Sequence, residues 1–454
     1  MSESLSKSIY FLELGLSFTI PLPLAIKKLI LFLLLSVLGF SAWAQNDSSA
    51  NTVKIITEDS VPKIKPKLRP KDSLMQKRKH RTVEEKDLNE VAHYLLHPKI
   101  PYEELTEEKI NHKTHYSLVP AVGYTLQTGF AGLISANAAY YTDDKLDEKL
   151  STLTASFTYS QYQQTIVPFQ ANIWTKGNRY NYITDFRFIN YPSDVYGLGG
   201  KTDPNQGVTI NFSGIKIHQT VMKSIRDNFL LGIGYYFDTY WNIKTLDKVS
   251  RLENFIISRR IGKREEASGP AFRAILDTRL NQINPEQGIY SSLTYRTNFI
   301  GLGSQQNSQI LQWDNRAYIR FPTHSTNVIA FWAYVWLVTG GTDPYLLLPS
   351  TGWDDNYNTG RGYIQGRFRG NHMYYGESEY RFKITRNGLL GGVAFLNIES
   401  FSPELSSTYS KLFPGYGLGL RFKINKHSGT NLCLDYGFGE SGSKGFFVNL
   451  GEVF

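Results

Sequence analysis

From Tyr116 to Phe454, apolar and polar residues alternate in segments of ten to fifteen residues. Because neighbouring side chains on a strand point to opposite faces, each such segment has one apolar and one polar face. This pattern is typical of a membrane barrel with lipid outside and a polar lumen, and also of a soluble sheet that buries its apolar face. Segments of about ten residues match a membrane-spanning strand. The aromatic content of 14% also favours the barrel.

Sixteen such segments are expected, which predicts an all-β fold: a sixteen-stranded antiparallel transmembrane β-barrel. The even number places both ends of the barrel on the periplasmic side. Three longer connections, 191–206, 243–269 and 341–371, should be extracellular or folded into the lumen. The expected strands lie near 116–126, 129–142, 150–161, 164–175, 179–190, 207–220, 227–242, 270–279, 288–299, 306–321, 326–340, 372–386, 388–400, 413–425, 429–439 and 444–454.

The chain before the strands divides into two parts. Residues 1–44 are expected to be a secretory signal peptide, because two lysines precede a short apolar run that ends in Ala42-Trp43-Ala44. A retained anchor is the alternative, and the length before the lysines suggests an over-extended start. Residues 45–114 are expected to be a basic, largely disordered periplasmic linker with one short helix near 83–97. Residues 115–454 then form the barrel.

The net charge of +9 lies mostly in that linker. Between Lys54 and Arg81, ten basic residues face three acidic ones, which gives +7. Such runs are usually solvated segments, and no nucleic-acid-binding signature accompanies this one, so no nucleic-acid partner is expected. A single cysteine, Cys433, excludes a disulfide within the chain.

The sequence favours a protein that is not an enzyme. It holds no nucleophile elbow, phosphate-binding loop or HExxH motif, and its histidines lack ligand spacing. We therefore expect no catalytic residue, no metal site and no cofactor.

Two short motifs predict structural roles. In "DTRLNQINPEQG", Asp277 and Arg279 share one strand face, expected to be the lumen, while Pro285 and Gly288 belong to a tight turn. In the final "FFVNLGEVF", one face of the last strand is expected to carry four apolar residues, an ending typical of outer-membrane barrels. These four residues are Phe446, Val448, Leu450 and Phe454.

The stretch "NTGRGYIQGRFRG" (358–370) combines four glycines with three arginines in one long connection. Glycines permit backbone angles that other residues resist, as a loop turning into a barrel requires. Arg361 would then need a carboxylate in a confined lumen, and Glu379 can supply it. The alternative is a surface loop whose arginines face lipopolysaccharide phosphates.

Several motifs together resemble the BamA/TamA outer-membrane barrel superfamily, also called the bacterial surface antigen family. They are "GRGY" (360–363), "GESEYRF" (376–382), "GGVAFLNIES" (391–400), "DTRLNQINPEQGIY" (277–290) and the final "NLGEVF". The resemblance covers roughly residues 115–454. It implies a sixteen-stranded barrel that inserts or translocates proteins, with the loop between strands 11 and 12 folded into the lumen.

The resemblance also implies roles for particular residues. Gly360, Arg361, Gly362 and Tyr363 form the loop motif, and its arginine meets acidic residues on strands 12 and 13. Glu379 matches the acidic position on strand 12, and Glu377 shares its face. On strand 13, Asn397 stands where the family has an aspartate, and Glu399 replaces a glycine.

Three functional classes remain open. The first is an assembly or translocation factor that acts through a weak seam between the first and last strands, where Pro120 and Gly123 weaken pairing. The second is a porin-like or solute-binding barrel, and the third is a soluble β-protein. The linker does not show the pattern of POTRA modules. The expected location is the outer membrane of a Gram-negative bacterium, with lipid, lipopolysaccharide and either unfolded outer-membrane proteins or a periplasmic protein as partners.

Overall fold

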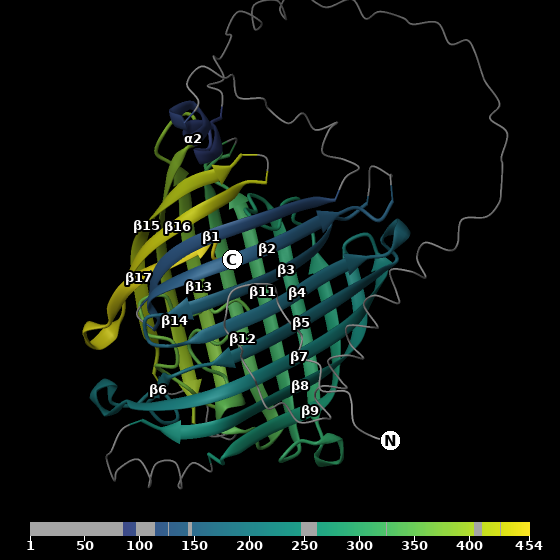
Figure 1. Cartoon of the computed structure of the whole chain (residues 1–454), viewed down its shortest axis with the longest axis vertical. Coiled ribbons are helices and arrows are strands. Elements are labelled where there is room, and N and C mark those ends of the chain that lie inside the picture. Colours follow the sequence, from purple (N-terminus) through teal and green to yellow (C-terminus); the bar gives the residue numbers. More distant parts are fainter. Residues whose placement is uncertain are drawn as a thin grey trace, which may run out of the picture. The chain divides into compact units, whose positions relative to one another are not determined.

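The computed structural model describes residues 85–96, 114–125, 127–143, 148–246, 261–323, 325–403, 411–426 and 428–454. In these ranges one helix, α2 (Leu88–Leu96), precedes a single sheet of 17 strands (Figure 1). The strands are β1 (His115–Thr125), β2 (Gly129–Tyr140), β3 (Ser151–Ser160), β4 (Thr165–Trp174), β5 (Tyr180–Asn190), β6 (Ser193–Val195), β7 (Val208–Arg226), β8 (Phe229–Thr245), β9 (Arg264–Asp277), β10 (Gly288–Asn298), β11 (Ser308–Arg320), β12 (Val328–Gly341), β13 (His372–Lys383), β14 (Leu390–Ser402), β15 (Phe413–Asn425), β16 (Thr430–Phe438) and β17 (Lys444–Leu450).

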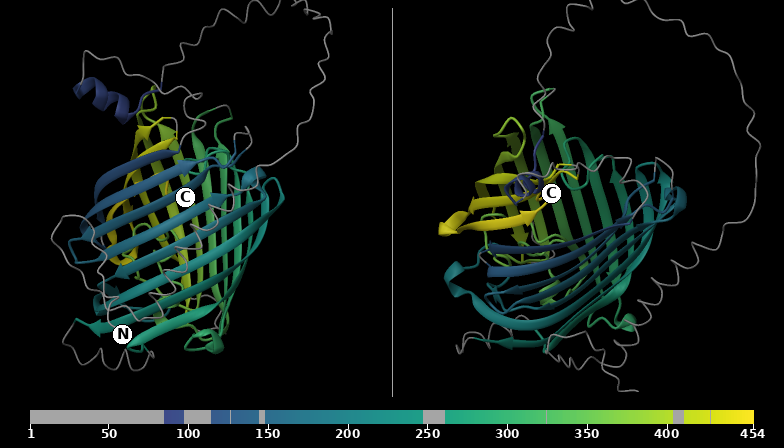
Figure 2. Two further views of the ribbon diagram at one scale, coloured as in Figure 1. Left: turned by 45° about the vertical axis from the view of Figure 1, so that its right-hand side comes forward. Right: turned by 45° about the horizontal axis from the view of Figure 1, so that its top comes forward.

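The sheet is an antiparallel meander that curls into a barrel (Figures 1 and 2). Each strand pairs with its neighbour in sequence, except that β5 pairs with β7 while β6 pairs only with the start of β7. The edge strands are β1 and β17, and no ladder joins them among the described residues. They nevertheless lie close together, since a Cβ built on Gly123 would be 3.6 Å from Cβ of Val448. The barrel is therefore brought together without being closed by hydrogen bonds.

The expected number of sixteen strands is wrong. The additional strand, β6, lies inside the connection 191–206 that was expected to be a loop. It forms because β7 is 19 residues long and extends beyond β5, which leaves its first residues free to pair with Ser193–Val195. As a consequence, the connection predicted between strands 11 and 12 runs from β12 to β13.

The two faces of the sheet differ as the alternation predicts. The outer face exposes large apolar side chains, including Tyr116 (80% exposed), Val122 (76%) and Leu418 (68%). On the inner face of β13, Glu377, Glu379 and Arg381 are buried. No helix within the described ranges is long and apolar enough to span a membrane.

The helix expected near 83–97 is α2, Leu88–Leu96. Asp87 caps it by accepting a hydrogen bond of 2.8 Å from the Glu90 amide, and its other carboxylate oxygen accepts one of 2.9 Å from the Lys426 amide. Glu85 contacts Lys383 at 2.6 Å. These contacts attach the helix to the ends of β13 and β15. The expected signal peptide and most of the linker lie outside the described residues.

Candidate functional site

The connection from Thr342 to Asn371, between β12 and β13, enters the barrel. Gly360 and Gly362 have positive φ angles of 79° and 110°, in the left-handed region that favours glycine. Space also requires glycine, because a Cβ on Gly360 would lie 2.4 Å from Cγ2 of Thr351 and one on Gly362 would lie 2.5 Å from the Phe438 carbonyl oxygen. These two glycines let the backbone turn at the position where Arg361 enters the lumen.

Arg361 is 2% exposed and reaches carboxylates on two different strands. Its Nη2 contacts Glu377 and Glu379 on β13, and its Nη1 donates a 2.5 Å hydrogen bond to Oδ2 of Asp435 on β16. The guanidinium also lies over the Phe395 ring, 3.8 Å from its centre. Burial alone would lower the pKa of Arg361, but the carboxylates of Glu379 and Asp435 outweigh burial and raise it.

Two further arginines join this cluster from the barrel wall. Arg381 Nε donates to Glu379 Oε2 at 2.7 Å. Arg421 donates to Asp435 Oδ1 at 2.5 Å and to Glu452 Oε2 at 2.8 Å. Three arginines therefore face four carboxylates, and the side chains of all seven residues are at most 7% exposed. We name these seven side chains the arginine cluster: Arg361, Arg381, Arg421, Glu377, Glu379, Asp435 and Glu452.

The loop backbone is fixed by neighbouring hydrogen bonds. Asn397 Nδ2 donates to the carbonyl oxygen of Arg361 at 2.8 Å, so this residue holds the main chain. Within the described part of the chain, it makes no hydrogen bond to the guanidinium. Tyr363 donates to the Pro414 carbonyl at 2.7 Å, and burial raises the pKa of its hydroxyl to about 12.

The other two arginines of the motif bind elsewhere in the protein. Arg369 donates to the Tyr345 carbonyl at 2.9 Å. The remaining arginine of the motif, Arg367, donates to Thr202 at 2.7 Å.

The structure brings Arg361, Glu377, Glu379 and Asn397 together as one site. The sequence does not link Asp435 to this site. Its place in the alternation directs it toward the lumen, but no pattern fixes the distance between strands that far apart. Glu399 on β14 stands where the family resemblance predicts a glycine. Its carboxylate accepts a hydrogen bond of 3.1 Å from Thr351 Oγ1. It contacts none of the arginines in the cluster among the described residues.

The second motif forms a separate structural turn. Asp277 and Arg279 make an ion pair of 2.9 Å, and Gly288 adopts a φ of 107° beside it. Pro285 is buried in the turn. A contact that the sequence did not predict comes from Asn281, which donates to the Ser428 carbonyl at 2.9 Å and so joins this turn to the one after β15.

The prediction for the final residues is wrong for Phe454. Phe446 and Leu450 are on the outer face, 53% and 48% exposed, and Val448 alternates with them. The strand ends at Leu450, and Gly451 then turns the chain with a φ of 86°. Phe454 is consequently 3% exposed and packs 5.2 Å from the Trp332 ring. The turn also carries Glu452 to Arg421, which explains why a carboxylate interrupts this apolar ending.

The antiparallel barrel, its apolar outer face and its inward loop define the fold class of outer-membrane β-barrels. The crystal structure of BamA from Haemophilus ducreyi lacking POTRA domains 1–3 matches 74% of this chain and 70% of its own, at 12% identity and a TM-score of 0.50. CdiB from Acinetobacter baumannii matches 75% of this chain and 60% of its own, at 13% identity and a TM-score of 0.48. At 12% identity, the likeness to the BamA structure shows the fold alone. No protein-family model and no curated protein matches the sequence.

Proposed function

We propose that this chain is an outer-membrane barrel that assembles or translocates other proteins through the edge between β1 and β17. The observation that carries the proposal is that these strands lie together without a ladder. An unpaired strand edge presents free N–H and C=O groups that can pair with another chain. Such strand addition is a general mode of polypeptide recognition.

The residues of β1 support an edge that is weakly paired. Pro120 has no amide hydrogen to donate, and Gly123 weakens a strand because it lacks a side chain to pack. Between Tyr116 and Val122, large apolar side chains face outward. A client strand that added to β1 would thus continue the lipid-facing surface of the barrel.

The arginine cluster supplies the rigid side of this proposed seam. Asp435 is on β16, next to β17, and Arg361 joins it to β13. Buried pairs of this kind are costly to break singly, so they resist movement of β16. In the proposal, β17 and β1 can separate while the wall from β13 to β16 keeps its shape.

A reversible cross-link tests the proposal. In a Cys433→Ser background, Gly123→Cys and Val448→Cys would join the seam, because their 3.6 Å Cβ separation suits a disulfide. The full chain in lipid vesicles would be given an unfolded outer-membrane barrel protein, and its folding followed by gel mobility. We expect acceleration by the reduced protein and none by the oxidised one. Full activity of the oxidised protein, or no acceleration by the unmodified chain, would contradict the proposal.

A matched control places the same cross-link inside a ladder. Ala136 and Ala155 are paired across β2 and β3, away from the seam. Oxidation of Ala136→Cys with Ala155→Cys should leave the acceleration unchanged. Loss of activity in this control would mean that oxidation, and not closure of the seam, causes the effect.

A second candidate function is a porin-like or solute-binding barrel. It is favoured by a polar cavity of about 430 Å³ in the lumen. Conductance across a planar bilayer distinguishes the two, since a conducting lumen would show steps in current when no client protein is present.

A further inference from the structure

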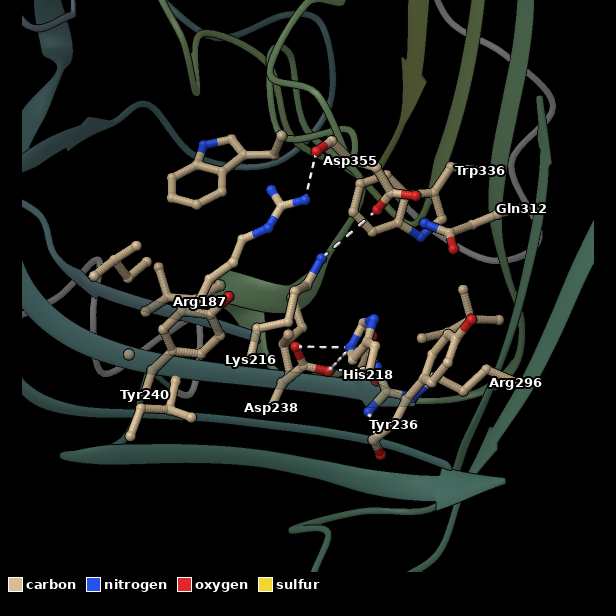
Figure 3. A pocket seen from close by; sticks show the side chains of 18 of the residues that line it. Arg187, Lys216, His218, Tyr236, Asp238, Tyr240, Arg296, Gln312, Trp336 and Asp355 are labelled. Carbon is tan, nitrogen blue, oxygen red and sulfur yellow. Dashed lines mark hydrogen bonds and ion pairs between the residues drawn. The ribbon is translucent and has the colours of Figure 1, made fainter. Parts of the chain in front are cut away.

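A second charged and aromatic region lies in the lumen. Figure 3 shows its labelled side chains, which come from β5, β7, β8, β10, β11, β12 and the lumenal loop. It contains a cavity of about 60 Å³, which shares His218, Tyr236, Gln312 and Asp355 with the larger cavity of about 430 Å³. Asp355 belongs to the loop that carries Arg361. We name these two adjacent spaces, which share four lining residues, the double cavity. Its contacts differ from those of the arginine cluster, and the proposed seam does not use them.

Three buried polar atoms around the double cavity have no hydrogen-bond partner in the described part of the chain. They are Nε1 of Trp336, Nε1 of Trp353 and Oδ2 of Asp343. All three residues line the smaller space. The other oxygen of Asp343 is satisfied, since it accepts from Ser308 at 2.6 Å. Buried polar groups in native proteins are nearly always paired. Water or a hydroxyl-bearing ligand offers both kinds of group, and would pair with these atoms after a small shift of the side chains, since each atom is closed to water in this conformation.

The charges of the double cavity cancel within the protein. Arg187 pairs with Asp185 at 2.7 Å, and Arg296 pairs with Asp238 at 2.5 Å. Across both spaces four arginine or lysine side chains face four aspartates: Arg187, Lys216, Arg273 and Arg296 against Asp185, Asp238, Asp343 and Asp355. An anionic ligand would meet as many carboxylates as cations. The balance therefore favours a neutral ligand.

The walls provide flat apolar surfaces beside these polar groups. Tyr236, Tyr240, Trp336, Trp353 and Tyr357 line the smaller space. Tyr236 is held by His218, whose ring stacks on it at 4.0 Å with an interplanar angle of 2°. His218 is in turn fixed by Asp238, 3.0 Å from its Nε2. The larger space adds threonine, asparagine and glutamine side chains from β3 to β5.

From these observations we propose that the double cavity binds a neutral saccharide. A sugar ring offers C–H faces that pack on aromatic rings, and hydroxyl groups that both donate and accept hydrogen bonds. The indole N–H groups of Trp336 and Trp353 would donate to sugar oxygens, and Asp343 would accept from a hydroxyl. Because Trp353, Asp355 and Tyr357 come from the lumenal loop, the loop forms one side of the site.

Calorimetric titration of the full chain tests this inference, in a zwitterionic detergent without a sugar headgroup. The probes are glucose, galactose, N-acetylglucosamine, maltose and the acidic sugar glucuronate. We expect at least one neutral sugar to bind with a Kd of about 1 mM or tighter. Trp336→Phe keeps an aromatic ring but removes the N–H donor, and should weaken that Kd by about tenfold. Trp353→Phe should have the same direction of effect.

The matched control is Trp313→Phe, which changes a tryptophan that is 48% exposed on the outer face. Its Kd should equal that of the unmodified chain. Heat-dependent gel mobility shows whether each variant is folded. If Trp336→Phe does not fold, the Kd of Trp353→Phe decides the test. Binding of glucuronate alone, no binding of any neutral sugar, or an unchanged Kd in the folded variants would overturn the inference. None of these results depends on the seam, which the cross-link tests separately.

Discussion

Arg361 and Asp435 are 74 residues apart in the chain, and their side chains meet at 2.5 Å inside the barrel. Asp435 is also held by Arg421, again at 2.5 Å. The loop arginine is thus tied to β16 as well as to the two glutamates of β13. The loop therefore links β13 to β16, on the part of the wall next to the proposed seam.

Arg361→Ala should destabilise the barrel. It would leave Glu377, Glu379 and Asp435 near one another with one cation fewer, and removing one partner from a buried pair typically costs about 3–5 kcal/mol. The measurement is the temperature at which the barrel loses its fast gel mobility. Arg320→Ala is the control, because Arg320 and its partner Glu286 are 45% and 42% exposed. Exposed pairs contribute about 0–1 kcal/mol to stability. Equal losses of stability in the two variants would therefore contradict a stabilising role for the buried Arg361 contacts.

Asp435→Asn should also destabilise the protein, and its effect should not add to that of Arg361→Ala. Both changes remove the same contact, so a double-mutant cycle should give a coupling energy of roughly 0.5–3 kcal/mol. Additive effects would show that Asp435 interacts with Arg421 alone. The loop would then be held only by Glu377 and Glu379.

Phe454→Ala should cost more stability than Phe446→Ala. Phe454 is buried against Trp332, and truncation of a buried phenylalanine typically costs about 3–5 kcal/mol. Phe446 lies on the exposed outer face. Unfolding by heat, measured by gel mobility in one detergent, compares the two. A smaller loss for Phe454→Ala would mean that the last residues continue the strand instead of turning inward.

Asp87→Ala should release α2 from the barrel. Asp87 caps the helix and accepts from the Lys426 amide, and loss of such a cap costs about 0.5–2 kcal/mol. Faster amide exchange across Leu88–Leu96 would report the release. Glu85→Ala is the comparison, since the Glu85–Lys383 pair is partly exposed and should matter less.

The sequence predicted the features that depend on neighbouring residues. Alternation identified the faces of β13 and placed Glu377 and Glu379 together, because a period of two fixes the direction of each side chain. The glycines around Arg361 predicted a sharp turn for a similar local reason.

Features that depend on distant pairing were not predicted. Asp435 could not be matched to Arg361, since the register between β13 and β16 is set by every strand between them. The strand β6 depends on how far β7 extends beyond β5. At Gly451 the chain turns inward. Phe454 therefore leaves the outer face, although the alternation of the last strand would have placed it there.

Amide hydrogen exchange at the edge strands tests the central claim most directly. The full chain in lipid nanodiscs would be exchanged and compared strand by strand. Amides of β1 and β17 that do not pair with β2 or β16 should exchange at least about tenfold faster than those of β3, which is paired on both sides. Equal protection of β1, β3 and β17 would show that the barrel is closed by hydrogen bonds, and would contradict the seam.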